Sequence, residues 1–206
     1  MMIELSEVTL EAQFHASTIE DSPTLILSHP HPVYGGTMKN KVVDQIYRRS
    51  VERNWNVFRY NTRGFGKSSG SFDKGIGEEK DLDEIVKWVA NQSSVNVHRI
   101  WLIGYSFGSW ITAKIASKWK VPCMLIAPPV SMYAFPNLDF DQPKIIFSAQ
   151  KDELISFDET LAFAETISEP KLHVPILGAD HYFIGTTSLL IREVFKQLDA
   201  FNKELF

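Results

Sequence analysis

Short runs of apolar residues recur along the chain, and most of them do not alternate strictly with polar positions. Runs of this kind are typical of strands that are buried on both faces of a parallel sheet. The segment 7–14 does alternate, and we expect an edge strand there. The expected buried strands are 24–28, 56–60, 99–104, 123–127, 144–149 and 172–177.

Between these runs, the apolar residues follow a helical period. In 78–90, apolar side chains such as Leu82 and Val89 fall on one face, and acidic residues occupy the first turn, where the helix dipole favours them. The same pattern predicts helices at 40–52, 107–118, 157–167 and 187–201. Alternating strands and helices indicate an α/β fold, with a doubly wound, mostly parallel sheet and helices on both faces.

The composition is that of a globular protein, and it bears on the number of domains, the partners and the location. The 206 residues suit one hydrophobic core, and because we find no repeat or linker we expect a single domain over 1–206. The net charge of −4 is mild and gives no reason to expect nucleic acid or an anionic membrane as a partner, so we expect neither. The lone Cys123 cannot form an internal disulfide, which favours a reducing, cytoplasmic location. We expect neither a signal peptide nor a membrane span.

A serine stands between two glycines where the expected strand 99–104 meets the expected helix 107–118. The pentapeptide Gly104-Tyr-Ser-Phe-Gly108 has the form G-x-S-x-G, which between a strand and a helix indicates a nucleophile elbow. Such a turn lifts the hydroxyl of Ser106 above the sheet edge, where the backbone N–H of Phe107 can face a developing oxyanion. The alternative interpretation is a tight turn without chemistry.

A serine nucleophile needs a base, and in this context the base follows the serine in the chain. Only His173 and His181 follow Ser106. His173 lies inside an expected strand, whereas His181 comes after that strand in a loop that can reach across the carboxyl edge of the sheet. We therefore choose His181.

The base in turn needs a carboxylate that orients its ring. Asp152 comes just after the expected strand 144–149, at the same edge of the sheet. Asp158 would lie within the next helix, and Asp180 adjoins His181, where adjacent side chains usually diverge. Asp152 is therefore the expected acid.

With Ser106, Asp152 and His181 in this order, the chain resembles an α/β-hydrolase-fold serine hydrolase over nearly its whole length. Three further stretches carry the resemblance. Residues 59–70 resemble a glycine-rich loop of the relatives, and residues 148–156 resemble their acid turn. Residues 25–38 resemble the segment that supplies a second oxyanion-hole N–H. There, a His-Pro-His-Pro sequence and a double glycine resemble a small bacterial subgroup.

The resemblance implies an oxyanion hole made by the N–H of Phe107 and a second N–H near His29. Pro30 has no N–H and is excluded. We prefer the N–H of His31, and those of Val33 and Tyr34 remain alternatives.

The resemblance also leads us to expect a site without a cap domain. The expected strands 123–127 and 144–149 are separated by only 16 residues, four of them proline. This stretch is too short and too rich in proline for a helical cap. We expect the site to be lined by Met132, Tyr133 and Phe135 from this stretch, together with Tyr34 and Tyr105.

The patterns that would indicate a nucleotide or a metal site are incomplete. Residues 66–68 read Gly-Lys-Ser, but position 61 is asparagine where a P-loop requires glycine, and the third glycine of a dinucleotide motif is displaced. His29 and His31 have no clear third partner for a metal. We therefore expect neither a cofactor nor a metal, and we expect Arg63 to form a salt bridge.

These observations predict a serine hydrolase, carboxylesterase-like, that cleaves a small ester or thioester through a Ser-Asp-His triad. The partner would be a small acyl substrate. The alternatives are a peptidase-type hydrolase and a binding or scaffold protein of the same fold without turnover. The oligomeric state stays open between a monomer and a homodimer.

Overall fold

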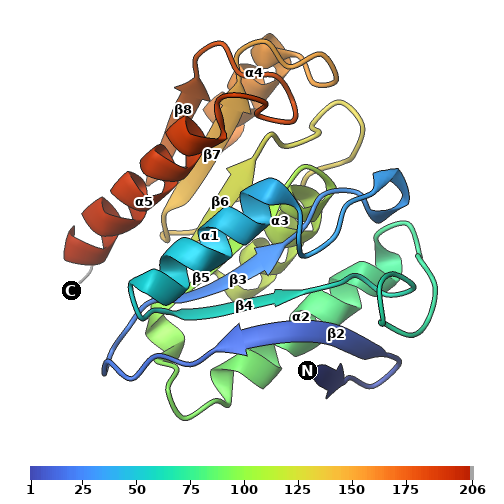
Figure 1. The fold of residues 1–206 in the computed structure, drawn as a ribbon. Coiled ribbons are helices and arrows are strands. Elements are labelled where there is room, and N and C mark those ends of the chain that lie inside the picture. The colour runs from blue at the N-terminus through green and yellow to red at the C-terminus, as the bar shows by residue number, and fades with distance from the viewer. Residues whose placement is uncertain (205–206) are drawn as a thin grey trace.

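The computed structural model describes residues 1–204, in which one eight-stranded sheet is covered by helices on both faces (Figure 1). The strands lie in the order β1-β2-β4-β3-β5-β6-β7-β8, and β4, β3 and β5 to β8 run parallel, while β1 and β2 are antiparallel to their neighbours. The strands are β1 (Met2–Glu4), β2 (Thr9–His15), β3 (Thr24–Ser28), β4 (Asn56–Tyr60), β5 (Ile100–Tyr105), β6 (Cys123–Ile126), β7 (Lys144–Ala149) and β8 (Lys171–Ile176).

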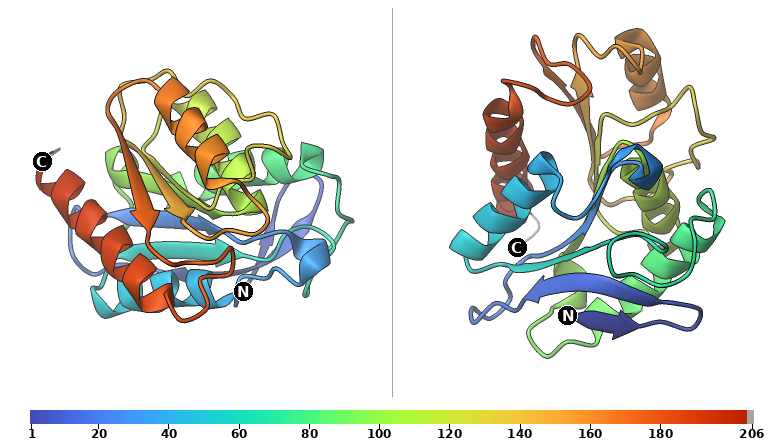
Figure 2. Two further views of the ribbon diagram at one scale, coloured as in Figure 1. Left: turned by 90° about the horizontal axis from the view of Figure 1, so that it is seen from above. Right: turned by 45° about the vertical axis from the view of Figure 1, so that its right-hand side comes forward.

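Two groups of helices form the outer layers (Figure 2). The helices are α1 (Lys41–Glu52), α2 (Ile76–Ala90), α3 (Phe107–Trp119), α4 (Phe157–Thr166) and α5 (Thr187–Glu204), with short 3-10 turns at Pro32–Tyr34 and Val97–Arg99. One apolar cluster joins the sheet to α1 and α5, and a second joins its other face to α2, α3 and α4. None of the helices in residues 1–204 is long and apolar enough to cross a bilayer.

The expected doubly wound α/β fold is confirmed, and the burial of the strands explains why the pattern predicted it. Every residue of β3 to β7 is buried, as continuous apolar runs require. No helix lies between β6 and β7. The segment 127–143 crosses there as a loop, so the expectation of a fold without a cap is also confirmed.

Two expectations about the sheet edges are wrong. The alternating segment 7–14 forms most of β2, which lies between β1 and β4, so that the short β1 is the edge strand instead. β8, expected to be buried on both faces, is the opposite edge, and most of its residues are only half-buried. Both errors have one cause: strand order depends on pairing between distant segments, which local hydrophobicity does not encode.

Candidate active site

The serine of the G-x-S-x-G turn has the strained geometry of an elbow. Ser106 joins β5 to α3 with φ +50° and ψ −122°, a conformation that residues other than glycine rarely adopt. A Cβ on Gly104 would lie 2.3 Å from the carbonyl oxygen of Gly108, and one on Gly108 would lie 2.5 Å from that of Ser28. Both glycines are therefore needed because backbone passes too close for any side chain.

The structure brings the three predicted residues together in one chain of hydrogen bonds. His181 Nε2 lies 3.1 Å from Ser106 Oγ, and His181 Nδ1 lies 2.8 Å from Asp152 Oδ2. The side chains of His181 and Asp152 are 6% and 3% exposed. Because the carboxylate can only accept, Nδ1 carries the proton and donates it, which leaves Nε2 free to accept from the serine hydroxyl.

The Asp152 carboxylate is itself held in place. Its second oxygen, Oδ1, accepts the backbone N–H groups of Leu154 and Ile155 at 2.9 and 2.8 Å. These bonds fix the turn after β7 and point Oδ2 at the imidazole. The acid is thus positioned by its own turn.

The residues that sequence reasoning set aside lie outside this chain of hydrogen bonds. His173, on β8, has its Nε2 2.7 Å from Oγ of Ser148 on the neighbouring strand β7. Asp180 Oδ1 accepts the N–H of Ile184 at 2.9 Å, and Asp158 lies in the first turn of α4.

On the opposite side of Ser106, a buried histidine organises the loop after β3. His29 Nδ1 donates to the carbonyl oxygen of Pro30 at 2.7 Å. Its Nε2 accepts the backbone N–H of Thr62 at 3.0 Å and lies 2.9 Å from Thr62 Oγ1. Burial lowers the pKa of His29 to about 4, so the ring is neutral at pH 7. Both ring nitrogens are engaged within the protein, and neither is free to bind a metal.

The loop 29–36 turns tightly and places backbone near the serine. Gly35 has φ +85°, and a Cβ on Gly36 would lie 2.0 Å from the carbonyl oxygen of Pro30. These contacts give the double glycine of the sequence a physical reason. Arg63, in the neighbouring glycine-rich loop, forms the expected salt bridge, with Nη2 2.6 Å from Asp81 Oδ1.

The backbone N–H groups of Phe107, the first residue of α3, and of His31 lie near the serine and have no hydrogen-bond acceptor among residues 1–204. Of the two alternatives, the N–H of Tyr34 already donates to the carbonyl oxygen of His31 at 3.2 Å. Val33 does not line the pocket that contains Ser106. These contacts favour His31 over both alternatives. The His31 ring is packed 4.9 Å from that of Phe107.

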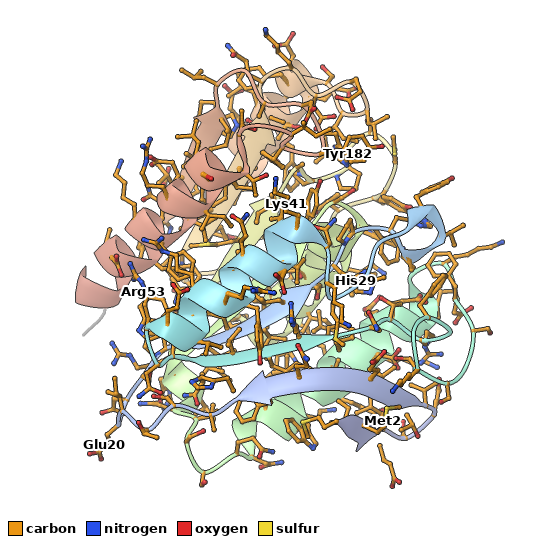
Figure 3. The ribbon with its side chains drawn as sticks, viewed as in Figure 1. Met2, Glu20, His29, Lys41, Arg53 and Tyr182 are labelled. Atoms are coloured by element: carbon orange, nitrogen blue, oxygen red, sulfur yellow. The ribbon has the colours of Figure 1, made fainter. Side chains whose placement is uncertain are left out.

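A pocket of about 500 Å³ opens beside Ser106 and His181. Figure 3 shows His29 and Tyr182 at this end of the sheet, with Arg53 at the far end. Four of the five expected wall residues line the pocket: Tyr34, Tyr105, Met132 and Tyr133. Sequence reasoning missed Leu154, Ile155 and Tyr182, although they lie within three positions after Asp152 and His181 in the chain.

The expectation for Phe135 is wrong. Its ring packs 5.0 Å from that of Phe163 in α4, in a separate hollow of the surface. Tyr133 stacks on Trp110 at 4.4 Å, and Trp110 Nε1 donates to the carbonyl oxygen of Ala134. Beyond this anchor the chain turns towards α4 and carries Phe135 away from the pocket.

The comparisons with known proteins concern the fold and the family of the chain. A family profile described as alpha/beta hydrolase fold matches residues 39–124. An uncharacterized protein of Rickettsia prowazekii is 31% identical over 188 residues, which are 86% of this chain and 79% of that protein. Other curated relatives are longer: the chain spans 60% of human alpha/beta hydrolase domain-containing protein 17B.

Solved structures are similar over nearly their whole length. An alpha-beta serine hydrolase homologue from Coxiella burnetii is 36% identical with a TM-score of 0.87, and the match covers 96% of each chain. An α/β serine hydrolase without lid from Xanthomonas campestris is 27% identical with a TM-score of 0.86, covering 98% of this chain and 93% of that one. With its lidless sheet and its elbow serine, the chain belongs to the α/β-hydrolase fold family.

Proposed function

We propose that this protein is a serine hydrolase that cleaves small, uncharged esters or thioesters through an acyl-enzyme on Ser106. The observation that carries the proposal is the hydrogen-bonded series Ser106, His181, Asp152 beside an open pocket. A scaffold protein has no need for a serine in strained backbone that is paired with a buried imidazole and carboxylate.

The first half of the reaction forms the acyl-enzyme. Ser106 Oγ attacks the carbonyl carbon while its proton passes to His181 Nε2, and Asp152 stabilises the imidazolium that results. The N–H groups of Phe107 and His31 bind the developing oxyanion, and one such donor is worth about 3 kcal/mol of transition-state stabilisation. His181 then gives the proton to the leaving alcohol or thiol.

The second half releases the acid. Water gives a proton to His181 Nε2 and attacks the acyl carbon. The bond to Ser106 Oγ then breaks, and His181 returns the proton to the serine. The same N–H groups bind the second oxyanion.

The pocket lining supports the choice of substrate. The residues that line it include no aspartate, glutamate, lysine or arginine. Besides the proposed base His181, the lining contains one histidine, His31, and burial lowers its pKa, which favours the neutral ring. A charged acyl group would lose its hydration there without a partner of opposite charge. Without a cap, little of a long chain would be buried, so long acyl groups gain little transition-state binding.

The nucleophile is tested by labelling with a fluorophosphonate, which reacts with activated serines. We expect the wild-type protein to be labelled once and Ser106→Ala not at all, with a loss in kcat of about 10⁴ or more. Ser131→Ala, at an exposed serine on the loop between β6 and β7, is the matched control. Labelling of Ser106→Ala equal to that of the wild type would refute the proposal.

Substrate size and charge are tested with 4-nitrophenyl acetate, butyrate and octanoate, and with the succinate half-ester as the charged counterpart of butyrate. We expect kcat/KM to be highest for the two short neutral esters and about tenfold lower or more for the half-ester. An amide of the same acyl group tests the peptidase alternative. A steady rise of kcat/KM to octanoate, or a jump in rate above the micelle threshold, would show a deep tunnel or a moving lid.

A further inference from the structure

The histidine and the serine of the site come from strands that are not neighbours. Ser106 follows β5, and His181 stands on the loop after β8, with β6 and β7 between them (Figure 1). Three strand spacings amount to about 14 Å. The loop 177–186 must therefore reach back across the sheet edge, and its position relative to the elbow depends on contacts outside the sheet.

Several bonds tie this loop to the acid turn beside it. The N–H of Lys151 donates to Ala179 at 2.7 Å, and Gly178 donates its N–H to Gln150 Oε1 at 2.9 Å. The N–H of His181 donates to Glu153 Oε2 at 3.2 Å. All these partners follow β7, so they position the loop against Asp152 and leave its position against Ser106 to other contacts.

Tyr105 supplies a link to the elbow. It is the last residue of β5, next to Ser106, and its hydroxyl donates to the carbonyl oxygen of His181 at 2.7 Å. Tyr105 is 3% exposed, and its ring lies 5.9 Å from that of the fully buried Phe183, which stands on the same loop as His181. Burial raises the pKa of the Tyr105 hydroxyl, which therefore keeps its proton and remains a donor.

The other hydrogen bond between the elbow and His181 is the one from Ser106 Oγ, and the reaction consumes it. Once Ser106 carries an acyl group, its oxygen has no proton to donate. His181 must then hold its place while Nε2 takes a proton from water. The bond from Tyr105 is made to the backbone of His181, so it persists through both halves of the reaction.

Resting on the proposed function, we propose that Tyr105 is a positioning residue that holds His181 against the elbow and acts most strongly in the acyl-enzyme. The step concerned is deacylation, in which water gives its proton to His181 Nε2, its oxygen bonds to the acyl carbon, and the proton returns to Ser106 Oγ as the ester bond breaks. A displacement of about 1 Å in a reacting group can cost about a hundredfold in rate.

The test removes only the hydroxyl, in Tyr105→Phe. The matched control is Tyr60→Phe, at a buried tyrosine of β4 whose hydroxyl lies 3.1 Å from Ser28 Oγ and does not contact His181. Each substitution removes one buried hydrogen bond, so we expect similar losses in the free energy of unfolding. Similar urea midpoints and near-ultraviolet circular dichroism spectra of the two variants establish that they fold equally well.

The probe is 4-nitrophenyl dimethylcarbamate, because carbamoylation releases nitrophenolate and decarbamoylation is slow enough to follow as returning activity. We expect Tyr105→Phe to slow decarbamoylation by about ten- to a hundredfold and carbamoylation by less than tenfold, with Tyr60→Phe within about twofold of wild type in both steps.

Decarbamoylation of Tyr105→Phe equal to that of Tyr60→Phe would overturn the proposal, as would a decarbamoylation rate that falls no further than the carbamoylation rate. Failure of the proposed function has a different signature: the wild-type protein would form no carbamoyl adduct at Ser106, which intact-mass measurement detects, and this proposal would fall with it.

Discussion

Two histidines stand at the same edge of the sheet, His29 after β3 and His181 after β8, and as whole residues they are 2% and 4% exposed. Each ring uses both nitrogens in hydrogen bonds. His29 contacts the carbonyl oxygen of Pro30 and two groups of Thr62, and none of its hydrogen-bond partners in residues 1–204 is a carboxylate. His181 lies between a carboxylate and a hydroxyl.

The difference in partners decides what each ring can do. His29 has its Nε2 lone pair occupied by two donors, and burial lowers its pKa to about 4, so it neither takes a proton at neutral pH nor reaches a substrate. In the proposed reaction, His181 takes the proton of Ser106 and Asp152 stabilises the imidazolium. Burial at a sheet edge is therefore no guide to a reactive histidine, whereas the neighbouring groups are.

The largest effect should come from replacing each of the two histidines in turn. We expect His181→Gln to lower kcat by about 10⁴ or more, because among residues 1–204 no other base is hydrogen-bonded to Ser106 Oγ, with little change in the free energy of unfolding. His29→Gln should instead lower the free energy of unfolding by about 1–3 kcal/mol and kcat by about tenfold at most. Ester hydrolysis and urea unfolding of both variants measure the contrast, and a greater loss of kcat in His29→Gln would reverse it.

The next effect tests whether Asp152 makes His181 different. Asp152→Asn should lower kcat by about 10³–10⁴, because an amide at this position favours the wrong imidazole tautomer. Asp180→Asn is the control, since Asp180 accepts only the N–H of Ile184 in its own loop. Steady-state kinetics of the two variants decide between the acids, and a larger loss in Asp180→Asn would show that our choice is wrong.

The smallest effect is a pH dependence of stability that belongs to His29. An unfolded histidine has a pKa of about 6.5 and the folded His29 about 4, so the unfolded chain binds the proton first as pH falls. The resulting stability is fully present above pH 6.5 and is lost towards pH 4, by about 3 kcal/mol.

This loss is measured as the free energy of unfolding in urea between pH 7 and pH 4. His29→Gln has no such group, so its curve should fall less steeply than that of the wild type over the same interval. Because all other titrating groups are shared, the difference between the two curves isolates His29. Parallel curves would contradict the assignment.

Much of this arrangement could be predicted from the sequence. The apolar runs of β3 to β7 and the G-x-S-x-G turn are local signals, because burial on both faces and a tight strand-to-helix turn each require particular residues at adjacent positions. Chain order and position after a strand then selected His181 and Asp152, since the carboxyl ends of parallel strands share one edge.

Other features were decided only by the tertiary structure. β1 is an edge strand because it pairs with β2 alone, and β8 is the opposite edge because it pairs with β7 alone. Phe135 packs against Phe163 because of the point at which its loop is anchored. The bond from Tyr105 to His181 joins residues 76 positions apart. Hydrophobic periodicity reports which face of an element is buried, but it does not say which distant group will meet it, and that choice is made by the packing of the whole chain.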